Sequence, residues 1–401
     1  MAKFKISAPG RIVLSGEHIA IYGKQFLATS LNLRTTLEFC ELLNVPKSNI
    51  RIEFPNINIE QDISMEEVEL FCSRPDNADI ISNPNDMFEY VQYMITVRKC
   101  MWTTNQQRFS LHVFLFLLYS IYYHEHLEIK PFRVRLFTEI PNTVGFGSST
   151  SFTVCVAACF LHWQRLQSGC NHIEFNNAEL ESIIKYTVSC EKSMQKFTFP
   201  DVDAHVCTYG KIVKCQRIDY KIYNIEPMEM EEMDILLTDS DVNLDKYTQA
   251  EQIAMLNVQT PANFNSILNK LEFLTINMYS SLKSLSDAIT STSLHLESES
   301  SLPPNVNYWF KKVTSHIKDN QQLLKKYNLS AQKFDDICQI AEKYELAGKF
   351  TGFNSRYVYT LPPPNCASNN VVINFQQNLL RENFKLPKET SINCEGVKIE
   401  N

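Results

Sequence analysis

The chain has 401 residues, 44% of them hydrophobic and 21% charged, and a formal net charge of -7. This length predicts two domains, and the lack of a basic stripe argues against a nucleic-acid partner. The longest apolar stretch, residues 111–123, is shorter than the roughly 20 residues that cross a bilayer. Because no apolar signal core follows the N-terminus, we expect a cytoplasmic protein with no membrane partner.

The first half of the sequence predicts a mixture of strands and helices. Alternating apolar positions predict strands at residues 4–7, 12–14, 26–29, 31–40 and 131–139. Residues 50–75 are expected to form edge strands and an acidic loop. Apolar positions at every third or fourth residue predict helices at 86–124, 148–166 and 179–194. Residues 206–209 and 211–215 are expected to form a hairpin that turns near Gly210.

The second half opens with an acidic, Met-rich stretch, residues 226–234 (EPMEMEEMD), interpreted as a solvated connector, with a partner-binding patch as the alternative. Strands are expected at residues 234–238, 356–361 and 370–375, and helices at 249–294, 305–327 and 330–346. Strands and helices that do not alternate strictly indicate an α+β fold. We place the boundary between the two domains, 1–225 and 226–401, at the acidic stretch.

Glycine is scarce: it makes up 10 of the 401 residues, about 2.5%, against a typical ~7%. Eight of the ten fall in four places, at Gly10, Gly16 and Gly23, at Gly145 and Gly147, at Gly210, and at Gly348 and Gly352. Glycine is required where φ is positive or where a ligand approaches the backbone closely. These positions are therefore expected to mark a site, with ordinary tight turns as the alternative.

The sharpest motif, residues 141–150 (PNTVGFGSST), joins a predicted strand to a predicted apolar helix. Free N–H groups and the helix dipole at a helix N-terminus favour a phosphate, and Gly145 and Gly147 let the backbone close on an anion. The hydroxyl groups beside them belong to Ser148, Ser149 and Thr150. No lysine follows the glycines, so this is not the GxxxxGK[ST] loop. A simple serine N-cap is the alternative.

Five segments together resemble the GHMP kinases. Residues 7–24 (SAPGRIVLSGEHIAIYGK) resemble the first motif, and residues 31–35 (LNLRT) are similar to the mevalonate kinase branch. The later resemblances are residues 141–150 to the phosphate-binding motif, 201–210 (DVDAHVCTYG) to the catalytic-aspartate segment and 347–352 (AGKFTG) to the start of the third motif. The resemblance implies a ribosomal-S5-like N-terminal lobe and a ferredoxin-like C-terminal lobe, with ATP and a small alcohol, mevalonate, between them.

The resemblance also implies roles at the acceptor. Asp203 would be the catalytic base or an orienting carboxylate, and Arg11 would face it across the cleft. Glu17 and His18 would contact the acceptor alcohol. A carboxylate within hydrogen-bond reach can take the proton of a hydroxyl group. A turn-forming Asp203 and a packed, structural His18 are the alternatives.

At the nucleotide, the resemblance implies that Ser149 and Glu191 hold Mg²⁺. The residues implied to line the triphosphate of ATP are Pro141, Gly145, Gly147, Ser148, Ser149 and Thr150. Phosphoryl transfer depends mostly on positioning and charge neutralisation, and Mg²⁺ prefers oxygen ligands while keeping some waters. An exposed helix carboxylate is the alternative for Glu191.

The sequence departs from the family pattern in three places. Arg11 replaces the lysine expected beside the catalytic aspartate; it keeps the charge but not the geometry or the transferable proton. Residues 353–357 (FNSRY) replace a run of glycines, and would crowd the nucleotide unless Arg356 reaches a phosphate instead. Residues 238–246 (TDSDVNLDK) lack the arginine expected near the acceptor.

Three functions are therefore weighed. The first is ATP-dependent phosphorylation of the primary hydroxyl of mevalonate. The second is phosphorylation of another small alcohol, such as phosphomevalonate or a sugar, and the third is a catalytically weakened regulatory relative. Retention of Asp203, Glu17, His18 and Ser149 favours an active enzyme. The oligomeric state is left open, with a homodimer among the alternatives.

Overall fold

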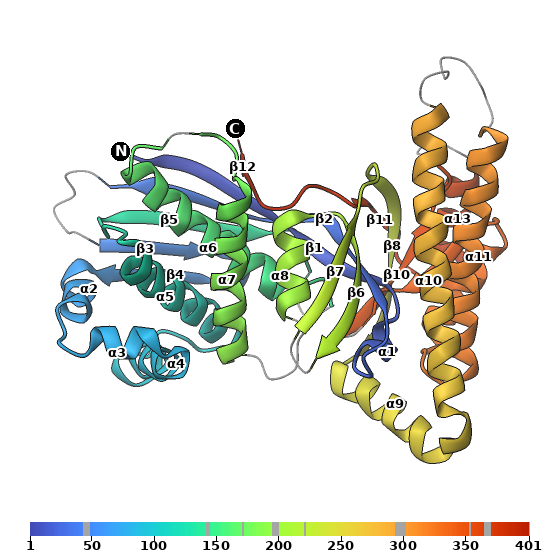
Figure 1. Cartoon of the computed structure of the whole chain (residues 1–401), viewed down its shortest axis with the longest axis horizontal. Helices are drawn as coiled ribbons and strands as arrows, with labels where there is room; N and C mark the ends of the chain where they lie inside the picture. Colours follow the sequence, from blue (N-terminus) through green and yellow to red (C-terminus); the bar gives the residue numbers. More distant parts are fainter. Residues whose placement is uncertain are drawn as a thin grey trace.

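Two long antiparallel strands, β1 (Lys3–Ser15) and β2 (Phe26–Glu41), run through the centre of the computed structural model (Figure 1). The structure describes residues 1–42, 49–141, 145–170, 172–194, 200–219, 222–292, 302–352, 354–364 and 370–400. The sequence predicts each strand as two shorter pieces. Their register shifts between Pro9 and Gly10 and between Val13 and Ser15, and such bulges break the alternation from which strands are predicted.

A twelve-stranded sheet builds on this pair, with the order β4-β3-β5-β2-β11-β8-β10-β9 along its main path. The further strands are β3 (Asn49–Phe54), β4 (Ile59–Ser64), β5 (Phe132–Thr138), β6 (Ile212–Asp219), β7 (Ile222–Met228), β8 (Met233–Leu244), β9 (Ala347–Phe350), β10 (Ser355–Leu361), β11 (Lys388–Ile392) and β12 (Lys398–Glu400). β12 pairs with β1, and β6 pairs with β2 and β7. The pairing of β3 with β5 is parallel, whereas the other described pairings are antiparallel.

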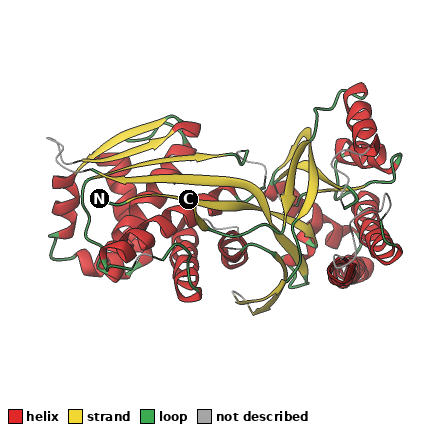
Figure 2. Ribbon diagram, turned by 90° about the horizontal axis from the view of Figure 1, so that it is seen from above, coloured by secondary structure: helices red, strands yellow, loops and turns green. Residues whose placement is uncertain are grey.

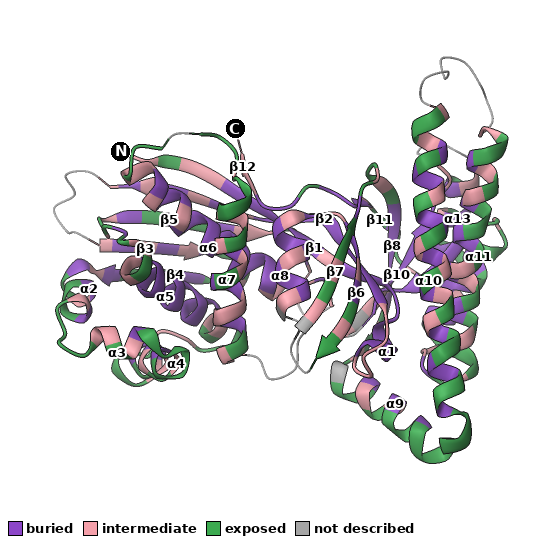
Figure 3. Cartoon of the chain, in the orientation of Figure 1, coloured by how far each residue is buried: buried purple, intermediate pink, exposed green. Residues whose placement is uncertain are grey.

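Helices cover one side of the N-terminal part of this sheet (Figure 2). They are α2 (Met65–Cys72), α3 (Asn77–Ser82), α4 (Pro84–Tyr93), α5 (Asn105–Glu125), α6 (Ser148–Gln167), α7 (Asn177–Met194) and α8 (Pro200–Tyr209), with single turns at Pro55–Ile57 and Met94–Arg98. Residues 110–121 of α5 are all buried, as the sequence predicts for its longest apolar stretch (Figure 3). No helix in the described part of the chain combines the length and apolar character needed to cross a bilayer.

The C-terminal helices are α9 (Lys246–Gln259), α10 (Pro261–Thr292), α11 (Pro304–Lys326), α12 (Gln332–Glu342) and α13 (Asn370–Arg381). α10 and α11 lie side by side beyond β8 and β10 (Figures 1 and 2). A buried polar chain joins them to the end of β1, since the Ser15 and Thr275 hydroxyl oxygens lie 2.7 Å apart and Asn320 Nδ2 donates to Ser15 Oγ at 2.7 Å. These bonds fix the end of β1, just before Glu17.

The α+β class is confirmed, and the division into two domains after residue 225 stays a prediction. Strand β11 lies between β2 and β8, and β12 pairs with β1. Residues 388–400 therefore return to strands from the first half of the chain.

Four local predictions are wrong. Residues 206–209 belong to α8 and not to a hairpin, and residues 370–375 open α13 and not a strand. Buried Val202 and Val206 are four residues apart, and buried Val372 and Phe375 are three apart, which is helical spacing. The acidic loop expected before residue 75 contains α2, and the expected connector at 226–234 begins inside β7.

Candidate active site

The loop between β5 and α6 ends in two glycines with left-handed backbone conformations, Gly145 at φ 75° and Gly147 at φ 67°. Gly147 is the N-cap of α6 and, as a glycine, has no side chain with which to cap this helix. The interpretation of its serines as an N-cap is therefore wrong. The first-turn N–H groups of Ser148, Ser149 and Thr150 lie at a helix N-terminus that attracts anions. Pro141 begins this loop, and residues 142–144 lie outside the described residues.

The loop packs directly on β1 at the first motif. The backbone N–H of Arg11 donates to the carbonyl oxygen of Phe146 at 2.8 Å. A Cβ on Gly10 would lie 2.8 Å from the same carbonyl oxygen, and one on Gly147 would lie 3.2 Å from Cβ of Arg11. Because both positions lack a side chain, the two motifs approach backbone to backbone.

Arg11 and Asp203 form an ion pair between Arg11 Nη2 and Asp203 Oδ2. Their side chains are only 13% and 9% exposed. Burial alone would lower the pKa of Arg11, but the Asp203 carboxylate beside it raises that pKa above its ordinary value overall. Asp203 lies inside the helix α8, so its interpretation as a turn former is wrong.

Glu191, on α7, is 1% exposed, and neither of its carboxylate oxygens has a hydrogen-bond partner among the described residues. Burial raises its pKa to about 8, and the negative charge of Asp203 adds to the effect, while Thr150 and Arg11 oppose it. Helix α7, which carries Glu191, packs against both α6 and α8, so Glu191 lies near the Arg11–Asp203 pair and the start of α6. Its interpretation as an exposed carboxylate is wrong.

Glu17 and His18 lie on the single turn α1 (Glu17–Ala20), which follows Gly16, and both are almost fully buried. Lys349 Nζ lies 2.8 Å from Glu17 Oε1. Burial would raise the pKa of Glu17, but Lys349, helped by His18, lowers it to about 2. The His18 ring meets the Phe350 ring edge-on, with centroids 5.7 Å apart, so this histidine packs as well as facing Glu17.

The third motif closes around this group. Gly352 has φ 102°, and a Cβ there would lie 3.1 Å from Val13 Cβ and 3.7 Å from Glu17 Cβ. Val13 also shares a buried cluster with Ala20 of α1 and Val202 of α8. The elements that carry Glu17 and Asp203 are therefore packed against each other through this cluster.

Two of the bulky residues that replace the family glycines, Arg356 and Tyr357, have defined contacts in the structure. The centre of the Tyr357 ring lies 4.9 Å from that of Phe146, in the loop between β5 and α6. Arg356 Nε and Nη2 lie 2.7 Å from carboxylate oxygens of Asp239 and Asp241, and this pairing contradicts the idea that Arg356 is directed to a phosphate. Phe353 lies outside the described residues.

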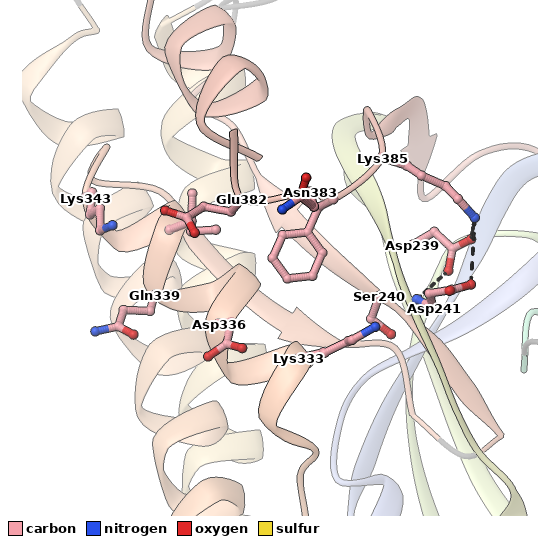
Figure 4. Close-up of a pocket in the computed structure, with 12 residues that line it drawn as sticks. Asp239, Ser240, Asp241, Lys333, Asp336, Gln339, Lys343, Glu382, Asn383 and Lys385 are labelled. Atoms are coloured by element: carbon pink, nitrogen blue, oxygen red, sulfur yellow. Dashed lines mark hydrogen bonds and ion pairs between the residues drawn. The ribbon is translucent and has the colours of Figure 1, made fainter. Parts of the chain in front are cut away.

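A separate pocket of about 490 Å³ lies between β8, α12 and the residues after α13 (Figure 4). It is open and carries charges of both signs, including Lys333, Lys343, Asp336 and Glu382. None of the site residues predicted from the sequence lines it. The described residues contain no group of three or more His, Cys, Asp or Glu side chains arranged for a metal.

No family model matches the chain. It is 26% identical over 361 residues to mevalonate kinase of Mus musculus and 24% identical over 359 residues to that of Homo sapiens, covering 86% of this chain and 82% of each relative. Its fold matches Methanococcus jannaschii mevalonate kinase with a TM-score of 0.62 at 15% identity, over 100% of this chain and 99% of the other. For Streptococcus pneumoniae phosphomevalonate kinase in complex with phosphomevalonate and AMPPNP, the TM-score is 0.57 at 12% identity, over 98% and 100%.

The chain resembles the GHMP kinases in sequence and in fold. Within this GHMP kinase fold, the predicted residues fall into two groups, Arg11, Asp203 and Glu191 near the loop that leads into α6, and Glu17 with His18 beside the third motif. Sequence reasoning assigned no role to Lys349, although it lies in the third motif. A lysine within a short apolar strand could have pointed to Lys349, because a buried charge requires a partner of opposite charge.

Proposed function

We propose that the chain is an ATP-dependent kinase that phosphorylates the primary hydroxyl of mevalonate to give 5-phosphomevalonate. The observation that carries the proposal is the buried Arg11–Asp203 pair, which lies beside Glu191 and against a glycine-rich helix N-terminus. The similarity to mevalonate kinases over 86% of the chain supports mevalonate as the acceptor. A cytoplasmic location and a homodimer stay predictions.

In the proposed mechanism, the N–H groups at the start of α6 hold the phosphates, and the fixed backbone contact between Phe146 and Arg11 sets their position relative to β1. Asp203 accepts the proton of the acceptor hydroxyl or orients that hydroxyl for attack. Arg11 pairs with the Asp203 carboxylate and supplies positive charge where phosphoryl transfer develops negative charge.

The residues present fit Mg²⁺. Neither carboxylate oxygen of the buried Glu191 has a hydrogen-bond partner among the described residues, so this group needs either a proton or a cation. The hydroxyl groups of Ser149 and Thr150 begin the adjacent helix. Mg²⁺ accepts such oxygen ligands and keeps several waters. Bound with ATP, it would neutralise charge on the phosphates. Glu191 and Ser149 would hold it.

A second candidate is phosphorylation of another small alcohol. Its support is the fold similarity to the phosphomevalonate kinase noted above and to Lactococcus lactis galactokinase complexed with galactose, for which the TM-score is 0.55. The departures at Arg11 and at residues 353–357 support the third candidate, the weakened regulatory relative.

The test is ADP release by the purified protein with MgATP and a panel of alcohols comprising mevalonate, phosphomevalonate and galactose, with Asp203→Asn as the control. We expect turnover with mevalonate and its loss in the variant. Turnover with another alcohol in place of mevalonate would establish the second candidate. ATP binding without turnover of any alcohol would favour the regulatory relative.

A further inference from the structure

Lys349, on β9, is completely buried in a largely apolar setting. Its side chain is 0% exposed, and that of Glu17 is 1% exposed. Nζ donates to Glu17 Oε1 at 2.8 Å and to the backbone carbonyl oxygen of Phe350 at 3.0 Å, and it lies 4.6 Å from the centre of the Phe350 ring. An ammonium group is costly to bury without a carboxylate, so the position of Lys349 is tied to that of Glu17.

The partner carboxylate is left half satisfied. Lys349 Nζ donates to Oε1 of Glu17, and His18 Nδ1 lies 3.4 Å from the same oxygen, whereas Oε2 is buried and has no hydrogen-bond partner among the described residues. Buried carboxylate oxygens are normally hydrogen-bonded. An ionised carboxylate can only accept, so the missing group is a donor such as a hydroxyl.

The surroundings hold this pair rigidly. The Phe350 ring is stacked on the Phe334 ring at 5.4 Å and meets the His18 ring edge-on at 5.7 Å. Backbone N–H of Phe350 also donates to the buried Gln321 at 3.3 Å. Gly352 leaves room for Glu17 where any side chain would press on Val13. Lys349 therefore has little freedom to leave Glu17.

We propose that Lys349 is a positioning residue that fixes Glu17 so that its second carboxylate oxygen accepts a hydrogen bond from a hydroxyl group of the acceptor alcohol. The inference rests on the proposed kinase function and adds a residue to its acceptor site. Lys349 acts through Glu17 and touches neither the acceptor nor the nucleotide. The pair carries no net charge, so it selects a hydrogen-bond donor at this point and not an anionic group.

The test is steady-state kinetics of Lys349→Met with mevalonate and MgATP. We expect the KM for mevalonate to rise about 10- to 100-fold, the range for losing a hydrogen bond to a charged group, with smaller changes in kcat and in ATP affinity. Lys349→Arg, which keeps the charge, should recover part of the loss. Arg165→Met is the matched control, because it removes a buried cation paired with Glu179 at 3.0 Å on the helical side of the sheet.

A folded Lys349→Met enzyme with an unchanged KM for mevalonate would overturn the inference, as would an equal rise in Arg165→Met. If Lys349→Met does not fold, Glu17→Gln/Lys349→Met removes both charges and avoids an unpaired buried ion. Its KM should equal that of Glu17→Gln alone, and a further additive rise would contradict the inference. A wild type that does not turn over mevalonate overturns the proposed function instead. Calorimetry of mevalonate binding without nucleotide then still decides the role of Lys349.

Discussion

The guanidinium of Arg11 on β1 contacts the carboxylate of Asp203 on α8, 192 residues further along the chain, and both side chains are almost fully buried. The backbone N–H of the same Arg11 donates to the carbonyl oxygen of Phe146, in the loop that leads into α6. Arg11, in the first motif, therefore contacts both Asp203 on α8 and the loop that leads into α6. Its charge acts on Asp203 and its backbone holds the loop.

Asp203→Asn should lower turnover of mevalonate by about 10²- to 10⁴-fold, the usual contribution of general acid–base catalysis. ATP affinity should survive, because the start of α6 is untouched. The measurements are steady-state turnover and nucleotide binding by calorimetry. Near wild-type turnover in this variant would remove Asp203 from the mechanism.

Arg11→Ala should depress turnover, because the buried Asp203 carboxylate loses its ion-pair partner and the site loses its positive charge. Arg11→Lys keeps the charge and the backbone contact to Phe146, so turnover should be similar or higher. Both variants are assayed beside the wild type at saturating mevalonate and ATP. Equal loss in Arg11→Lys and Arg11→Ala would show that the guanidinium geometry, and not its charge, is required.

Gly147→Asp should abolish the rise in melting temperature that MgATP gives by binding the folded state. The new carboxylate would face the phosphates, and its Cβ would press on Arg11. Gly169→Asp is the matched control, since Gly169 also has a positive φ, 82°, but an added Cβ meets nothing within 4 Å. Thermal protection that persists in Gly147→Asp would place the nucleotide elsewhere.

Ser149→Ala and Glu191→Gln should each raise the Mg²⁺ concentration needed for half-maximal activity, because each removes an oxygen ligand. A magnesium titration at fixed ATP is the measurement. Identical half-saturation in the wild type and both variants would exclude both residues from the metal site.

The Glu17–Lys349 pair should make stability depend on acid pH. The folded pKa of Glu17, about 2, lies below its ordinary value of 4.5, so the folded state favours the ionised form. This contribution is complete above about 4.5 and is lost as the pH falls towards 2, by roughly 1 kcal/mol at pH 4. Between pH 6 and pH 4, the free energy of unfolding measured in urea should fall more in the wild type than in Glu17→Gln/Lys349→Met. Parallel slopes would contradict the ionised pair.

The sequence predicts the α+β class and most helices because apolar spacing is local information. The same spacing is present in α8, where Val202 and Val206 are four residues apart, but the glycine at 210 favours the prediction of a hairpin that includes residues 206–209. The α13 helix was missed in the same way, at a run of β-branched residues. Tertiary burial of one helical face overrides such local preferences.

The site residues were predictable to the extent that family motifs carry them. The contacts between them were not, because the Glu17–Lys349 pair joins residues 332 positions apart. Nothing local in either segment specifies that pairing. The pairing of Arg356 with Asp239 likewise depends on the register of β10 against β8, which a single sequence does not reveal.

The place of β11 has a consequence for synthesis on the ribosome. Ile392 pairs with Leu31 of β2, and residues 388–392 pair with β8, so this strand joins two parts of the sheet made much earlier. Such long sequence separations slow folding. While the chain emerges, those edges of β2 and β8 lack this partner and are open to pairing with other chains. A nascent chain stalled before residue 388 should therefore bind chaperones more strongly than one released with β11 in place.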